Sequence, residues 1–150
     1  MLRNTAIELV LDFVNSEDAS DPPQALALRE AMRGVIGAQG RRVAFPIDVA
    51  TLNAAVMASR LRFRFGSDGR ARLEPEADGI EGDMGRLMAI FIAASADPDW
   101  KRLKVCARPS CRNVFFDRSR NRSSRWCSMA TCGNREKAMR FRRRARSAAV

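Results

Sequence analysis

Four cysteines lie in the last third of the chain, and the chain contains no histidine. The cysteines form two pairs with four residues inside each pair, and fifteen residues separate the pairs. Four thiolates satisfy the tetrahedral coordination of zinc, and a site filled by four protein ligands leaves no open position for catalysis. The spacing therefore predicts one structural zinc ion. Its expected ligands are Cys106, Cys111, Cys127 and Cys132.

Two disulfides, or four free buried thiols, are the alternative interpretations of these cysteines. The N-terminus lacks the basic start and the small-residue cleavage site of a secretory signal, and disulfides are rare in the cytoplasm. The longest apolar run, residues 87–94, is too short to cross a bilayer. We therefore expect a cytoplasmic protein that binds zinc and has no membrane partner.

The charge of the chain is divided unevenly between its two parts. Residues 1–100 hold 11 Arg and no Lys against 15 Asp and Glu, a net charge of −4. Residues 101–150 hold 16 Lys and Arg against two acidic residues, a net charge of +14. Such an asymmetry indicates two tasks, with the basic part meeting a polyanion. A solvated basic tail is the alternative.

Helical periodicity dominates the first hundred residues. Apolar residues recur at helical spacing in 6–15, although the β-branched content leaves a strand open. A second helix is expected from Pro23 to about residue 36, with Leu26 among its inward residues, and a third with Asp48 as its N-cap. A fourth is expected over 83–95, ending before Asp97-Pro98-Asp99.

Between the third and fourth helices the period changes to two. Residues 60–65 alternate strictly, a Gly/Asp turn follows, and residues 70–73 alternate again, which predicts a β-hairpin. Leu61, Phe63 and Phe65 are expected on its buried face. The fold class is therefore α+β: a mostly helical domain with one hairpin at 1–98, followed by a zinc finger with a basic C-terminal helix at 99–150.

The residues between the cysteines indicate how the finger is built. Residues 114–116 suit a strand, 124–126 suit its partner, and 117–123 form a polar loop. Ser128 is a suitable N-cap for a helix whose first turn contains Cys132. A knuckle, a hairpin and a helix that supplies the last ligands make a treble-clef-like finger.

The second half of the chain also resembles a known family, the CGNR zinc finger. The resemblance spans about residues 103–144 and includes the four cysteines, Phe115-Phe116-Asp117, Ser119-Arg120-Asn121, Trp126-Cys127-Ser128 and Cys132-Gly133-Asn134-Arg135. Residues 11–16, Leu-Asp-Phe-Val-Asn-Ser, are similar to the start of the ABATE domain that usually precedes this finger. The resemblance implies a bacterial zinc-binding protein involved in stress-related transcription regulation.

The basic residues of the finger lead to a functional hypothesis. Arginine's planar fork suits both phosphate oxygens and guanine edges, so a DNA-binding transcription regulator is expected, with an N-terminal domain that forms a homodimer or senses a ligand. An RNA-binding protein, and an adaptor that holds an acidic protein, are the alternatives. The expected nucleic-acid contacts are Arg118, Arg120, Arg122, Arg125, Arg135, Lys137, Arg140, Arg142, Arg143 and Arg144.

Few residues outside the finger suggest a specific site. Asp12 and Asn15, two polar residues in an apolar segment, are the candidates for ligand binding, and capping or internal hydrogen bonds explain them equally well. The chain has no His, no Tyr and no phosphate-cradling glycine loop, and it contains no recognisable nucleophile motif. We therefore expect no enzymatic activity and no catalytic residues.

Overall fold

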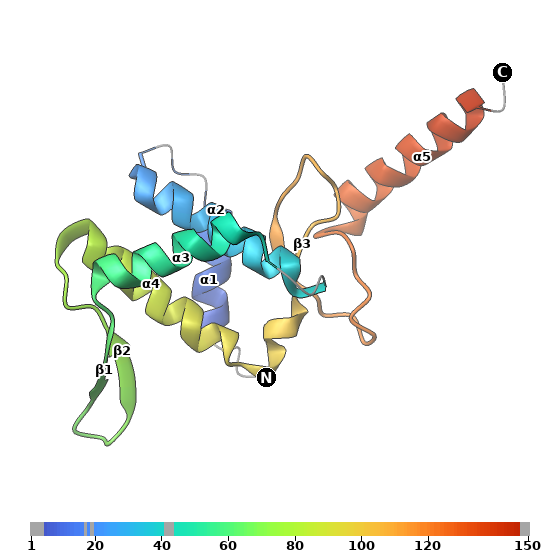
Figure 1. Ribbon diagram of the computed structural model, residues 1–150. Coiled ribbons are helices and arrows are strands. Elements are labelled where there is room, and N and C mark those ends of the chain that lie inside the picture. The colour runs from blue at the N-terminus through green and yellow to red at the C-terminus, as the bar shows by residue number, and fades with distance from the viewer. Residues whose placement is uncertain (1–4, 17, 19, 41–43, 148–150) are drawn as a thin grey trace. The chain divides into compact units, whose positions relative to one another are not determined.

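Helices and two small hairpins make up the structure, a computed structural model that describes residues 5–16, 18, 20–40 and 44–147 (Figure 1). The chain divides into two units, Met1–Lys101 and Arg102–Val150. The α+β fold class is confirmed. None of the described helices is both long and apolar enough to span a membrane. The elements are α1 (Thr5–Asn15), α2 (Pro23–Gly37), η1 (Ala38–Gly40), α3 (Pro46–Ser59), β1 (Arg62–Phe65), β2 (Ala71–Glu74), α4 (Gly79–Ser95), η2 (Pro98–Arg102), β3 (Leu103–Val105), β4 (Val114–Phe116), η3 (Met129–Gly133) and α5 (Asn134–Ser147).

The core of the first unit lies between α1, α2 and α4. The predicted helical stripe of α1 is confirmed, because Ile7, Val10 and Val14 are buried. The prediction for Leu26 is wrong: this residue is 43% exposed, and the buried positions of α2 lie on the adjacent side of the helix. One buried position of α2 is held by Arg29, whose Nε donates to the carbonyl of Phe13 at 3.0 Å.

The start of α3 differs from the prediction. The helix begins at Pro46, because proline suits the first helical position, and Asp48 lies in the first turn instead of at the N-cap. The Asp48 carboxylate lies against Gly34 of α2, where an added Cβ would come within 1.9 Å of Oδ2. Gly34 therefore permits the close contact between α2 and α3.

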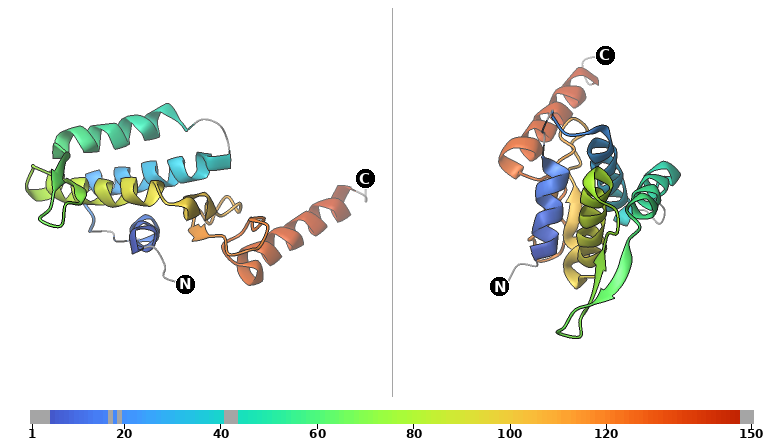
Figure 2. Two further views of the ribbon diagram at one scale, coloured as in Figure 1. Left: turned by 90° about the horizontal axis from the view of Figure 1, so that it is seen from below. Right: turned by 90° about the vertical axis from the view of Figure 1, so that its left-hand side faces the viewer.

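The hairpin forms as predicted, but its apolar face is not buried. Strands β1 and β2 are antiparallel, with Phe63 opposite Leu73. Phe63 is 74% exposed and Phe65 is 78% exposed, because the hairpin extends away from the end of α3 instead of lying on the core (Figures 1 and 2). On the other face, Arg62 Nε lies 2.8 Å from a carboxylate oxygen of Glu76.

Helix α4 starts at Gly79, earlier than the expected residue 83. Its close contact with the end of α3 depends on Gly85. A Cβ at this position would lie 2.5 Å from the Cβ of Ser59 and 2.7 Å from that of Pro75. Ser59 is fully buried, and its carbonyl accepts hydrogen bonds from the backbone of Glu76 and Ala77 at 3.1 and 3.2 Å. These contacts fix the position at which the β1–β2 hairpin departs from helices α3 and α4.

In the second unit, β4 forms as predicted, but the predicted partner strand is wrong. Strand β4 pairs antiparallel with β3, so the hairpin lies before the loop and not across it. Residues 124–126 do not pair with β4; the backbone hydrogen bond that they form runs from Ala107 N to Arg125 O, at 2.8 Å. The predicted cap is confirmed, since the Ser128 hydroxyl accepts from Thr131 N at 3.3 Å. The π-helical turn η3 follows it and leads into α5.

We expect Gly85→Ala to destabilise the protein by about 1–2 kcal/mol. Alanine favours a helix interior by about 1 kcal/mol over glycine, but overpacking against Ser59 and Pro75 outweighs that gain. Urea denaturation of the zinc-loaded protein, followed by circular dichroism, measures the change. A variant as stable as the wild type, or more stable, would show that α3 and α4 can move apart at this contact without lowering the free energy of unfolding.

Candidate metal centre

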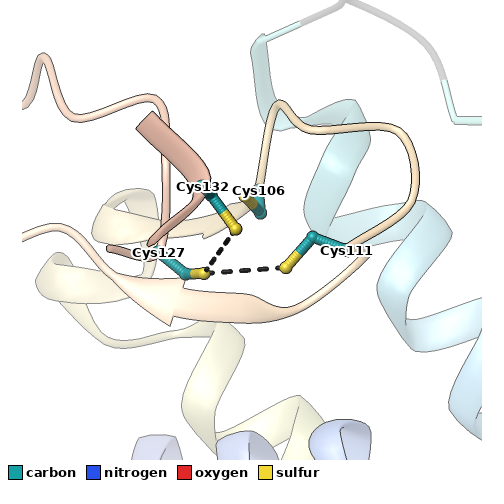
Figure 3. Close-up of side chains that lie close together, drawn as sticks. All are labelled: Cys106, Cys111, Cys127 and Cys132. Atoms are coloured by element: carbon teal, nitrogen blue, oxygen red, sulfur yellow. Dashed lines mark hydrogen bonds between the residues drawn. The ribbon is translucent and has the colours of Figure 1, made fainter. Parts of the chain in front are cut away.

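The four cysteine sulfurs of the second unit converge on one point (Figure 3). All of the ligand atoms lie within 4.8 Å of one another; Cys111 Sγ is 3.6 Å from Cys127 Sγ, which is 3.8 Å from Cys132 Sγ. Four sulfurs bound at about 2.3 Å to a tetrahedral zinc ion would lie about 3.8 Å apart. The donor set and its spacing therefore fit one zinc ion, and none of the cysteines forms a disulfide.

The first pair of ligands lies on the connection between β3 and β4. Cys106 follows β3 directly, and its backbone N–H donates to Asn113 O at 2.8 Å. The N–H of Cys111 donates to Arg108 O at 3.0 Å. Arg112 takes a left-handed conformation with φ of 53°, which turns the chain back toward β4. The knuckle thus positions two thiols within a loop of eight residues, 106–113.

The second pair lies where the loop passes into a helix. Cys127 precedes the Ser128 cap, and Cys132 lies in the π-helical turn η3. Gly133 is buried beneath Met129 and Trp126. A Cβ at this position would come within 2.6 Å of Met129 Sδ and 3.6 Å of the indole ring, so a larger residue here would displace the Met129 side chain. Cys132 itself is buried in this turn.

The pKa values of the thiols explain why the four sulfurs bind a cation when they are deprotonated. Burial and the nearby Cys111 thiol raise the pKa of Cys127 to about 12, and burial also raises the pKa of Cys111. Burial acts to raise the pKa of Cys132 too, but hydrogen bonds with Cys111 and Arg108 lower it to about 7. Four thiolates in so small a volume require a bound cation, and zinc supplies it.

One buried charged residue of the second unit was not predicted. Asp117 is fully buried, and its carboxylate accepts from Lys104 Nζ at 2.6 Å, Ser119 N at 2.9 Å and Ser124 N at 3.1 Å. Burial acts to raise the pKa of Asp117, but the hydrogen bonds from Lys104 and Ser119 hold it well below its usual range. Asp117 is the only acidic residue between positions 100 and 135. A single carboxylate among so many cations was the sequence feature that could have identified it as a structural ion-pair partner.

Lys104 and Arg102 extend this contact into the loop of residues 118–125, which we call the arginine loop. Lys104 Nζ donates to the carbonyls of Arg122 and Ser124, the latter at 3.3 Å. Arg102 Nη1 donates to the carbonyls of Asp117 and Ser119 at 3.1 and 3.3 Å. Two cations and one buried carboxylate therefore fix the backbone of the arginine loop.

The residues expected to contact nucleic acid are all exposed. Helix α5 has no buried residue, and it projects from the loops of its own unit (Figure 1). In the first unit Asp12 is exposed and Asn15 is half-buried in α1, and neither belongs to the cysteine group. The exposed cations are Arg118, Arg120, Arg122 and Arg125 of the arginine loop, and Arg135, Lys137, Arg140, Arg142, Arg143 and Arg144 of α5.

We expect the protein to purify with one equivalent of zinc, and Cys111→Ser to weaken zinc binding more than about 100-fold. The substitution removes one of four thiolates, and metal binding supplies much of the folding free energy of so small a unit. Elemental analysis and chelator competition measure both quantities. Ser110→Ala is the matched control and should bind zinc as the wild type does. Less than half an equivalent of zinc, with oxidised cysteines, would contradict the site.

We expect Asp117→Asn to weaken zinc binding about 10- to 100-fold, because breaking a buried ion pair destabilises the folded finger that zinc stabilises. Chelator competition measures the change. Glu136→Gln removes the other acidic residue of 101–150 and should change the affinity less than about threefold. Equal affinities for the two variants would show that Asp117 does not support the centre.

Comparison with known proteins agrees with this geometry. No curated protein matches the chain. The match to a family model covers residues 102–145 and does not reach the first unit, so the expected ABATE domain stays a prediction. The segment that holds the four cysteines, residues 102–145, matches the CGNR zinc finger, and it binds one structural zinc ion.

Proposed function

We propose that the chain is a DNA-binding transcription regulator whose zinc finger contacts DNA. The observation that carries the proposal is the set of ten exposed cations on the arginine loop and α5, placed on a unit that zinc makes rigid. Residues 101–150 have a net charge of +14. Phosphate contacts by Lys and Arg supply most of the sequence-independent affinity for DNA.

The arginine loop supports the proposal through its backbone. The carbonyls of Ser119, Arg122 and Ser124 are already hydrogen-bonded to Arg102 or Lys104. The loop is therefore held in one conformation while its arginine side chains are exposed to solvent. A preorganised set of cations loses less conformational entropy on binding than a disordered tail does, which favours a binding surface over a solvated tail.

Helix α5 supports the proposal through its shape. With 14 residues it is about 21 Å long, and a helix of this kind fits the major groove of B-DNA. Ala138, Phe141 and Ala145 form a narrow apolar stripe, and Phe141 is 73% exposed. The cations cover most of the remaining circumference, so both walls of a groove would meet positive charge.

The arginine loop also fits partners other than DNA. RNA binding is the second candidate, because the arginine loop suits single strands or stems equally well, and an acidic protein partner is the third. We propose a cytoplasmic protein without enzymatic activity, whose first unit forms a homodimer or senses a ligand as an ABATE domain. Asp12 and Asn15 remain the candidates for such a ligand.

We expect the triple variant R140A/R142A/R144A to bind duplex DNA about 10²- to 10³-fold more weakly at 0.1 M salt. It should also reduce the slope of log K against log salt by about 3, because each lost phosphate contact releases about one counterion fewer. Gel-shift titrations over a salt series measure both values.

The matched control is R70A/R72A/R86A, which removes three exposed arginines from the first unit and changes the net charge equally. It should bind DNA within about threefold of the wild type. If both triples lost affinity alike, net charge and not α5 would be responsible. If a stem-loop RNA or an acidic protein bound more tightly than duplex DNA in the same assay, that molecule and not DNA would be the partner of the finger.

A further inference from the structure

The outward side of α3 is an unusual surface for an exposed helix. Figure 2 shows α3 as the outer layer of the first unit, and its contacts are with α2 and α4. We call its exposed side the α3 surface. It consists of Pro46, Ile47, Val49, Ala50, Asn53, Ala54, Met57 and Ala58.

The α3 surface carries no charged residue. Asp48 is the only charged residue of the helix, and it lies on the opposite side against Gly34. Ile47 is 72% exposed and Met57 is 79% exposed. A surface helix of a soluble protein normally presents charged residues to water, and a helix that is apolar all round is normally buried. The α3 surface is therefore expected to be covered in solution.

The core of the first unit does not need this surface. The inward side of α3 already meets α2 at Gly34 and α4 at Gly85, where Ser59 is fully buried. The apolar residues on the outward side thus have no packing role among the described helices of the first unit. An uncovered apolar area of this size normally marks an interaction site.

The exposed apolar area on α3 and on the segments that flank it approaches the size that a stable dimer needs. Three large apolar residues of the α3 surface, Ile47, Val49 and Met57, are 42–79% exposed, and three that flank α3 in the sequence, Phe45, Phe63 and Phe65, are 61–78% exposed. At roughly 100 Å² of exposed surface each they present about 600 Å². The alanines of α3 add to this, and each partner of a standard interface contributes about 800 Å².

We propose that the α3 surface is a homodimer interface whose partner is the α3 surface of a second copy. An uncharged face meets its own copy without burying an unpaired charge, whereas a partner with a charged face would leave those charges unpaired. Homodimer interfaces are also more apolar than those of transient complexes. Ala50, Ala54 and Ala58 recur at every fourth position and let two helices approach closely.

The charge of the second unit disfavours a dimer contact through that unit. The second unit is strongly positive and would repel its copy, while the α3 surface contributes no charge to that repulsion. Phe63 and Phe65, which follow α3 in the sequence, are exposed as well, on strand β1. A twofold contact between identical faces is the commonest form of oligomer.

The test is the mass of the nuclease-treated, zinc-loaded full chain by light scattering and sedimentation at 0.5 M salt. We expect a dimer of about 33 kDa, twice the chain mass of 16.7 kDa. Ala54→Glu places one charge in the centre of the face and should weaken dimerisation at least tenfold. Ala27→Glu, the same change at an exposed position of α2, should leave the dimer unchanged.

A wild-type chain that stays monomeric at 100 µM would overturn the proposal, as would equal masses for the two glutamate variants. Circular dichroism and zinc content show whether Ala54→Glu remains folded. If it does not, Met57→Glu gives the same test at a side chain that is 79% exposed and has little role in folding. A folded Met57→Glu variant that dimerises as the wild type does would also overturn the proposal.

Discussion

Coordination of zinc by four thiolates is the interaction on which the second unit depends. Its strands have three residues each, and its buried apolar side chains are few, with Leu103 and Val114 the largest. A core of this size cannot offset the conformational entropy of ordering about fifty residues. The zinc–thiolate bonds supply the difference, and they also join the β3–β4 knuckle to η3, from which α5 begins.

A second constraint follows from the charge that the finger carries. Cations placed close together repel one another, and a loop rich in arginine would expand without an internal anion. Asp117 provides that anion, and because it is buried its attraction for Lys104 is weakly screened. One carboxylate thus stabilises both the strand that carries Lys104 and the loop that carries four arginines.

Local sequence predicted those features that depend on local chemistry. The cysteine spacing predicted the metal ligands, Ser128 was identified as a cap because its side chain bonds within its own turn, and the stripe of α1 follows from helical period alone. Some errors are local, such as the inward side of α2 at Leu26 and the start of α3 at Asp48, and the others concern long-range choices. Alternation places Phe63 and Phe65 on one face but does not state whether that face meets the core. The partner of β4 and the burial of Asp117 likewise depend on contacts far apart in sequence.

The absence of buried residues in α5 has a consequence for the order of the helix itself. Nucleation is the unfavourable step of helix formation, and helices of about this length are marginal in water without tertiary support. Here the turn that holds Cys132 is already fixed, so it acts as a permanent nucleus for the residues that follow. Helical order should then decrease along α5 with distance from the metal, and the arginines farthest from Cys132 gain the most order when a polyanion neutralises them.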